Sequence, residues 1–462
     1  MSLSEKVLNL YFGIFEEDRY IMQRRVSRIF ALILGIPLLL AMLAACGAGT
    51  TGNGNGGGSS TNTGSTTIKI ATDLPVSGGD ASIGKPTENG ARLALDQANT
   101  NKTIPGITLQ LVANDDVGVG GVHDPNKGAN NITSMIGDYL VAGVVGPFNS
   151  NVARAEMPIA NNAPIPLISP SNTNPCLTQN TAASGCNGEN DKIAVYRPTG
   201  KVTYFRVVTT DNLQGPAAAD YLYQKQNYKK VYVIDDTETY GVGLAKYFIP
   251  EWQKLGGTVI DHKSVKSTNS YLGLLTEVAS THPDVIYFAG NFSTGGTLLR
   301  KQMTQVQGLQ NVGFAGGDGI QDSSFATAVG TSGGPVFATV PAVDPSASPA
   351  AKDFVTAYTA KYGTIGAYSA PAYEAMNVMI QGIKTALSKT SAPKDSGDAT
   401  QGKVFRQAVI DAIQHLSFDG ILGHTGFDSN GDTTNKSLTI YQVANVNNQV
   451  GWKAVATQAV GA

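Results

Sequence analysis

Small polar and aromatic side chains follow five apolar stretches of this sequence, at the point where each stretch ends. "GVVG" (143–146) is followed by "PFNSN", and "PIPLI" (164–168) is followed by "SPSNTNP". These two places supply hydroxyls, amides and the start of a helix near Ser150, which suit a carboxylate. The other three places supply one acid and several aromatic rings. The candidate ligand-binding residues of the five places are Phe148, Ser150, Ser171, Thr173, Tyr240, Asn291, Phe292 and Asp318.

This set of side chains matches a small zwitterion with an apolar tail. The ligand's carboxylate would lie near Ser150, its ammonium near Asp318, and its tail against the aromatic rings. A purely structural interpretation stays open for single residues. Ser150 is a common helix cap, and Asp318-Gly319 is a common turn pair.

Catalytic and metal motifs are weak. "GTSGG" (330–334) satisfies the G-x-S-x-G pattern of serine hydrolases, but that pattern requires a strand before the serine and a helix after it, and here the order is reversed. The five histidines lack metal-ligand spacing. The segment 428–439 resembles a calcium loop without its glycine and glutamate, and is interpreted as a hairpin turn. We therefore expect a binding protein, with no enzymatic activity, metal or cofactor.

The elements that position these residues alternate between short apolar strands and amphipathic helices. From Ile68 to Ser169 the order is strand, helix, strand, helix, strand, helix, strand, and a second such series begins after the cysteines. Alternation at these lengths predicts βαβ units and parallel sheets. In open parallel sheets, ligands bind beyond the carboxyl ends of the strands. The sequence therefore predicts two α/β lobes whose strand ends carry the site.

The N-terminal region resembles an export signal. Arginines precede an apolar run that ends in "LAAC", which looks like a bacterial lipobox with Cys46 as the lipidated residue. The alternative is an uncleaved membrane anchor. Acidic residues before Met22 indicate that translation could start there. The Gly/Ser/Thr-rich segment up to residue 67 is typical of a flexible linker.

Composition and cysteine content narrow the class further. The chain has 462 residues, a net charge of −2 and 15% charged residues, so no basic surface for nucleic acid is indicated. After Cys46, the two remaining cysteines are Cys176 and Cys186. In an exported protein this spacing favours a disulfide, worth about 3 kcal/mol by loop closure. A metal site is the weaker alternative.

Several stretches carry a family resemblance in their order along the chain. They are "LPVSGGDASIGKPTENGARLALDQAN", "DDVGVGGVHDPNKGANN", "VVGPFNSN", "PLISPSNTNPCLT", "FRVVTTDNLQGPAAADYL", "VYVIDDTETYGVGLAKYF", "GFAGGDG" and "YSAPAYEAM". From Ile68 onward the chain resembles the leucine/isoleucine/valine-binding proteins, the type I periplasmic solute-binding components of ABC transporters. The resemblance implies two Rossmann-like lobes joined by three crossovers, with the ligand in the cleft between them.

The resemblance also implies residue roles. Ser150 would hold the ligand carboxylate, the backbone carbonyl at Ser171 would take the ammonium beside Thr173, and Asp318 replaces the usual glutamate that pairs with the ammonium. Tyr240 and Tyr373 would lie at the pocket. The chain departs from the family at Asn291-Phe292, where a tyrosine is common, and at Ile83, where an aromatic residue is common. Both changes affect the side-chain end of the pocket, so the solute itself stays open.

The resulting expectation is an exported lipoprotein on the outer face of the cytoplasmic membrane, monomeric, which delivers an amino acid to an ABC transporter permease. The alternatives are a sensing domain of the same fold, or transport of amides, urea-like solutes or aromatic acids. The expected segments are a signal peptide (1–45), a lipidated cysteine and linker (46–67), first-lobe segments (68–207 and 339–425) and second-lobe segments (208–338 and 426–462).

Overall fold

The computed structural model describes residues 65–181, 185–186 and 193–460. The expected signal peptide, Cys46 and most of the linker lie outside these residues. Within them, no helix is both long and apolar enough to span a bilayer.

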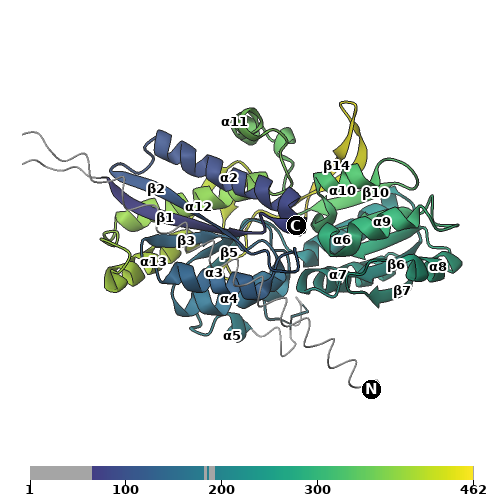
Figure 1. The fold of residues 1–462 in the computed structure, drawn as a ribbon, viewed down its shortest axis with the longest axis horizontal. Coiled ribbons are helices and arrows are strands. Elements are labelled where there is room, and N and C mark those ends of the chain that lie inside the picture. The colour runs from purple at the N-terminus through teal and green to yellow at the C-terminus, as the bar shows by residue number, and fades with distance from the viewer. Residues whose placement is uncertain (1–64, 182–184, 187–192, 461–462) are drawn as a thin grey trace, which may run out of the picture. The chain divides into compact units, whose positions relative to one another are not determined.

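The first lobe is built on a five-stranded parallel sheet in the order β2-β1-β3-β4-β5. Helices α2 and α12 lie on one face of this sheet, and α3 and α4 lie on the other (Figure 1). Coverage of both faces explains why β3 is apolar and buried throughout. The elements are β1 (Thr66–Leu74), α2 (Ala81–Thr100), β2 (Ile107–Asp115), α3 (Pro125–Ile136), β3 (Val141–Val145), α4 (Ser150–Asn162), β4 (Leu167–Ser169), α5 (Ile193–Tyr196), β5 (Tyr204–Arg206), α11 (Lys352–Tyr362), α12 (Ser369–Leu387) and α13 (Ala399–Gln414).

The second lobe is built on a seven-stranded sheet in the order β14-β13-β10-β9-β8-β6-β7. Its first five strands in chain order are parallel, and the two C-terminal strands add antiparallel at one side. The elements are α6 (Asp211–Asp220), β6 (Lys230–Asp235), α7 (Thr239–Lys254), β7 (Thr258–Ser264), α8 (Leu272–Ser280), β8 (Val285–Ala289), α9 (Thr297–Met303), β9 (Gly313–Gly316), α10 (Ser323–Val329), β10 (Val336–Val340), β13 (Ser437–Val446) and β14 (Gln449–Ala459).

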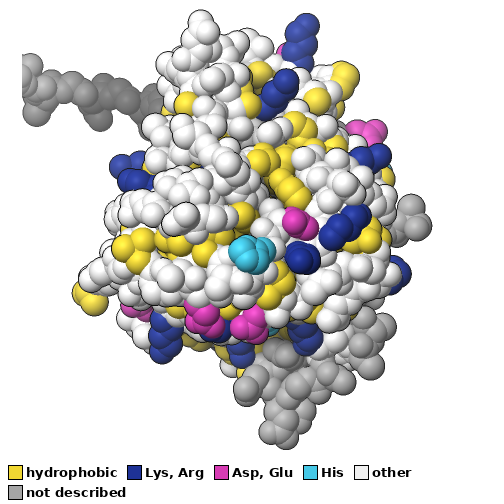
Figure 2. All heavy atoms as spheres, turned by 90° about the vertical axis from the view of Figure 1, so that its right-hand side faces the viewer, with side chains coloured by type: hydrophobic (Ala, Val, Ile, Leu, Met, Phe, Trp, Pro, Cys, Tyr) yellow, Lys and Arg dark blue, Asp and Glu magenta, His cyan; other side chains and the backbone are white. Residues whose placement is uncertain are grey.

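Three connections join the lobes, after β5, after β10, and between the small hairpin β11–β12 (Ser417–Gly420 and Gly423–Gly426) and β13. The two α/β lobes expected from the sequence are thereby confirmed. Gly330–Gly334 follows α10 and precedes β10, so the order of elements is that of an ordinary loop and not of a serine-hydrolase elbow. Basic and acidic side chains are interspersed on the face seen in Figure 2, with no large area of one sign.

Candidate ligand-binding site

Asp318 is the centre of a buried hydrogen-bond cluster directly after β9. Its Oδ1 accepts hydrogen bonds from Gln214 Nε2 at 2.5 Å and from the Tyr240 hydroxyl at 2.9 Å, and its Oδ2 accepts one from the Tyr368 hydroxyl. The residue is 6% exposed. A carboxylate has about four acceptor positions, so three neutral donors leave room for a further one from a ligand.

The cluster around Asp318 contains two acids, Asp318 and Asp211. Burial raises the pKa of Asp318, and burial together with the charge of Asp318 raises the pKa of Asp211 well above its usual value. Gln214 Nε2 also donates to Asp211 Oδ1 at 3.2 Å, so one amide spans both acids. No salt bridge to Asp318 occurs among the described residues. A cationic ligand group here would favour the ionised form of Asp318.

The first lobe faces this cluster with the loops after β3 and β4. Phe148 and Ser150 precede and begin α4, and both are buried. The carbonyl of Phe148 accepts hydrogen bonds from Ser171 Oγ at 2.8 Å and from Asn172 Nδ2 at 2.5 Å, which hold the two loops together. The hydroxyl of Ser171 is therefore used within the lobe, and its backbone is the part that could meet a ligand.

Two contacts bring the lobes together at this point. The ring of Phe148 meets the ring of Tyr368 edge-on, with centroids 5.1 Å apart, and Tyr368 in turn donates to Asp318 of the second lobe. The carbonyl of Thr173 accepts a hydrogen bond from the backbone N–H of Asp211 at 2.9 Å. The structure thus brings Phe148, Thr173 and Asp318, which are far apart in sequence, into one cluster.

Asn291 and Phe292 follow β8, and Asn291 borders the same cluster. Both are 7% exposed. A Cβ atom added at Gly319 would lie 2.9 Å from Asn291 Oδ1 and 2.8 Å from Tyr240 Cε1, so the Asn291 amide lies against the backbone that follows Asp318. The backbone N–H of Asn291 donates to Asp236 Oδ2 at 3.0 Å, which fixes the loop.

Tyr373 does not join this cluster. Its hydroxyl donates to Gln97 Oε1 of α2 at 2.6 Å, and its ring packs against Phe354 of α11 at 4.9 Å. Tyr368, five residues earlier at the start of α12, is the tyrosine that reaches Asp318. Five residues correspond to about 140° beyond one full helical turn, so the two tyrosines lie on different sides of the helix.

A buried histidine links the lobes at a second place. His123 donates from Nδ1 to Asp80 Oδ2 of the first lobe at 2.9 Å, and from Nε2 to Glu238 Oε2 of the second lobe at 2.8 Å. Its side chain is 0% exposed. Burial alone would lower the pKa of His123, but the two carboxylates outweigh it and raise the pKa to about 10. The imidazole is therefore charged in this arrangement.

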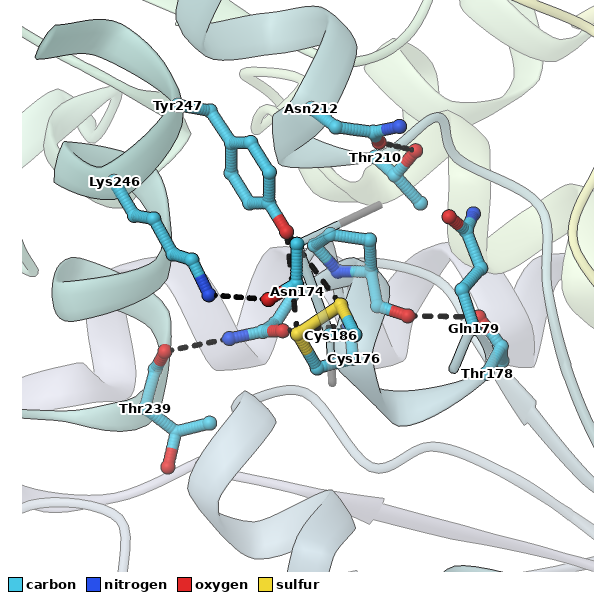
Figure 3. Close-up of a disulfide and its surroundings, with 12 residues drawn as sticks. Asn174, Cys176, Thr178, Gln179, Cys186, Thr210, Asn212, Thr239, Lys246 and Tyr247 are labelled. Carbon is cyan, nitrogen blue, oxygen red and sulfur yellow. Dashed lines mark hydrogen bonds between the residues drawn. A yellow bond between two sulfur atoms is a disulfide. The ribbon is translucent and has the colours of Figure 1, made fainter. Parts of the chain in front are cut away.

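The disulfide between Cys176 and Cys186 is present, and it lies beside α7 of the second lobe. Figure 3 shows Lys246 and Tyr247 of α7 directed toward it; Lys246 Nζ donates to the Gly185 carbonyl at 2.5 Å, and the Tyr247 hydroxyl lies 3.5 Å from Cys186 Sγ. A cavity of about 260 Å³ lies here between α4 and α7. Its lining residues are Arg154, Asn174, Cys176, Thr237, Glu238, Thr239, Val242, Gly243, Lys246 and Tyr247.

Three residues that contact Asp318 or link the lobes were not predicted from the sequence, because they do not directly follow strands. Gln214 lies in α6, Tyr368 just before α12, and His123 in the loop before α3. The only signal for these positions in the sequence was their residue type. That signal is not sufficient, because a tyrosine or histidine at the start of a helix has many structural roles. Buried carboxyls Asp73, Asp116 and Glu156 of the first lobe were also not foreseen.

Known proteins of similar sequence identify the family of this chain. A family model described as "Periplasmic binding protein" matches residues 67–448. The Leu/Ile/Val-binding protein BraC3 of Rhizobium johnstonii is 28% identical over 378 residues, which cover 81% of this chain and 91% of that protein. A leucine-, isoleucine-, valine-, threonine- and alanine-binding protein of Pseudomonas aeruginosa is 26% identical, with 81% and 90% covered.

A solved structure gives the same result for the fold. The leucine-binding protein LivK of Thermotoga maritima superposes with a TM-score of 0.68 at 26% identity, and the alignment covers 84% of this chain and 98% of that one. The two α/β lobes with three connections are therefore those of type I periplasmic binding proteins. With the family model matched across both lobes, the chain belongs to the periplasmic binding protein family.

Proposed function

We propose that this protein binds an amino acid between its lobes and delivers it to the permease of an ABC transporter. The ligand's carboxylate lies at the N-terminus of α4 with Ser150 and Thr173, and its ammonium lies at Asp318 and the carbonyl of Ser171. Phe148, Tyr240, Asn291 and Phe292 surround the rest of the ligand. The relatives that are named for leucine, isoleucine and valine support this class of solute.

One observation carries the proposal: buried polar atoms without partners occur in the candidate residues or beside them in both lobes. The first lobe contributes Asn149 Oδ1, in the residue between Phe148 and Ser150, and the second lobe contributes Gln214 Oε1 and Asn291 Nδ2. A buried polar atom without a hydrogen bond costs about 1–3 kcal/mol. A zwitterion offers both the donors and the acceptors that would pair such atoms, whereas an apolar ligand would leave them unpaired.

The mechanism is capture by closure of the lobes. A ligand that contacts both lobes only in the closed form favours that form by its differential affinity. The contacts from Tyr368 to Asp318 and from His123 to Glu238 exist only while the lobes are together, so they add to closure. The permease would then select the closed form.

A thermal-shift screen of the full chain tests the class of solute. The panel contains amino acids, aliphatic amides, urea and aromatic acids, each at millimolar concentration. We expect amino acids to raise the melting temperature, because a ligand that binds only the folded protein stabilises it. A shift with aromatic acids or amides, and none with amino acids, would overturn the proposed solute class.

Ser150→Ala is expected to weaken amino-acid binding by about 1–3 kcal/mol, roughly fivefold to 150-fold, if its hydroxyl donates to a charged carboxylate. Calorimetric titration with L-leucine measures the change. Ser134→Ala, in α3 of the same lobe and exposed, is the matched control and should leave the dissociation constant unchanged. An unaltered dissociation constant for Ser150→Ala would remove the hydroxyl from the site.

We also propose export and lipid anchoring through Cys46, with the protein monomeric on the outer face of the cytoplasmic membrane. The support is the sequence pattern before Cys46 and the family, whose members are extracytoplasmic. Palmitate labelling in cells should mark the wild-type chain and not Cys46→Ser. Equal labelling of the two would contradict this assignment.

A further inference from the structure

Arg206, the last residue of β5, is fully buried and uses all three of its guanidinium nitrogens. Nε donates to Asp432 Oδ1 at 2.7 Å. Nη1 donates to the carbonyl of Asn174 at 2.8 Å and to that of Asn172 at 3.1 Å, and Nη2 donates to the Thr178 hydroxyl. One side chain therefore binds several points of the loop after β4.

The two carbonyls bound by Arg206 flank Thr173, a residue of the proposed ligand site. This part of the loop belongs to no helix or strand, and the carbonyl of Asn174 accepts one backbone N–H, that of Leu177 at 3.3 Å. The carbonyl of Thr173 accepts the N–H of Asp211 at 2.9 Å, and the Thr173 side chain also interacts with the Asp211 carboxyl. Arg206 takes the place of regular secondary structure here and holds the backbone on both sides of the ligand-facing residue.

Asp432 connects this arrangement to the segments that join the lobes. It lies between β12 and β13, in the third connection, and Arg206 immediately precedes the first connection. The backbone N–H of Arg206 also donates to the Gly431 carbonyl at 3.1 Å, and Gln179 Nε2 donates to the other oxygen of Asp432 at 2.9 Å. The Arg206–Asp432 pair therefore joins two of the three connections to the loop that carries Thr173.

We propose that Arg206, held by Asp432, is a positioning residue. It keeps the Thr173 loop in its ligand-binding geometry and couples this loop to the connections between the lobes. The inference rests on the proposed function for the role of Thr173. If the loop were released, only a fraction of molecules would present Thr173 correctly. The apparent dissociation constant would rise by the inverse of that fraction, through slower association and with little change in dissociation.

The chain contains a matched control for the structural role of a buried arginine. Arg406 of α13 is 1% exposed and likewise binds backbone carbonyls, those of Val141 at 2.8 Å, Asp138 at 2.7 Å and Ile136 at 3.1 Å. These carbonyls lie between the end of α3 and the start of β3, at the opposite end of the first sheet from the ligand loops. Arg206→Lys and Arg406→Lys thus each remove a buried guanidinium group that binds backbone carbonyls, at different places in the fold.

Two measurements on the full chain test the proposal. In stopped-flow and calorimetric titration with L-leucine, Arg206→Lys should raise the dissociation constant at least tenfold through a lower association rate, and Arg406→Lys should change it less than twofold. In hydrogen exchange without ligand, the amide of Asp211, which donates to Thr173, should exchange faster in Arg206→Lys than in Arg406→Lys. Equal exchange in the two variants, or equal affinity, would overturn the proposal.

Asp432→Asn provides a second route if Arg206→Lys fails to fold. Asp432→Asn keeps the side-chain size and one acceptor oxygen. We expect the amide of Asp211 to exchange faster in this variant than in Arg406→Lys. If the wild type binds no amino acid, the proposed function fails, while the exchange comparison still decides whether Arg206 positions the loop.

Discussion

Asp318→Ala should abolish measurable binding of amino acids while the protein stays folded. The ammonium of a bound amino acid would lose an acid that accepts hydrogen bonds from both lobes, from Tyr240 and from Tyr368. Removing one partner of a buried charge pair costs about 3–5 kcal/mol, or more than a hundredfold in affinity. Asp318→Asn should give a similar loss, because it keeps the shape and removes the charge. Calorimetric titration with L-leucine measures both.

The matched control for Asp318 is Asp284→Ala. Asp284 Oδ2 accepts the backbone N–H groups of Lys229 and Lys230 at 2.7 and 2.8 Å, at the start of β6 and thus at the opposite end of the second sheet. This variant loses a structural carboxylate in the same lobe and should keep its affinity. A wild-type dissociation constant for Asp318→Ala would disprove the assignment of the head group.

Raising the pH from about 7 to 10 should weaken ligand binding by loss of the charge on His123. The pKa of His123 is about 10 while Asp80 and Glu238 contact it, and it would be lower when the lobes separate, because Glu238 leaves and only Asp80 still pairs with it. The contribution to closure is therefore fully present below the open-state pKa and is lost as the pH rises through 10. Of the other facing groups, Asn151 Nδ2 donates to Glu238 Oε2 at 3.3 Å, and Asp116 lies close enough for His123 to lower its pKa.

Glu238→Gln tests this link, because it keeps the size of the side chain and removes the charge that reaches across the lobes. We expect weaker binding than wild type at pH 7 and a smaller change of affinity between pH 7 and 10. The ammonium of the ligand titrates in the same way with the wild type and with Glu238→Gln. The ratio of their two dissociation constants at each pH therefore reports only on the protein's own groups. A ratio that does not vary with pH would exclude His123 as a charged link between the lobes.

Local patterns were sufficient for the fold, and they pointed to some residues of the cluster around Asp318. Strand and helix lengths predicted the two α/β lobes, and strand ends pointed to Asp318, Tyr240 and Phe148, which the structure brings together. This worked because parallel strands direct their carboxyl ends to one edge. The resemblance predicts Tyr373 at the pocket. In the structure Tyr373 contacts Gln97, and Tyr368 is the tyrosine that contacts Asp318.

The remaining features depend on contacts between distant segments. Arg206 and Asp432 are 226 residues apart, and His123 and Glu238 are 115 residues apart. Neither pair has a local sequence pattern, since each residue is an ordinary charged side chain until the lobes and their connections are assembled. The domain boundaries and the lipidation of Cys46 stay predictions.

The proposed ligand is a zwitterion with its ammonium at Asp318. The most direct measurement is calorimetric titration of the wild-type chain with L-leucine and with 4-methylpentanoate, the same molecule without its amino group. We expect L-leucine to bind and 4-methylpentanoate to bind at least a hundredfold more weakly. Without an ammonium, 4-methylpentanoate leaves the Asp318 carboxylate buried without a cation and adds its own carboxylate charge to the site. Equal affinity for the two ligands would contradict this expectation.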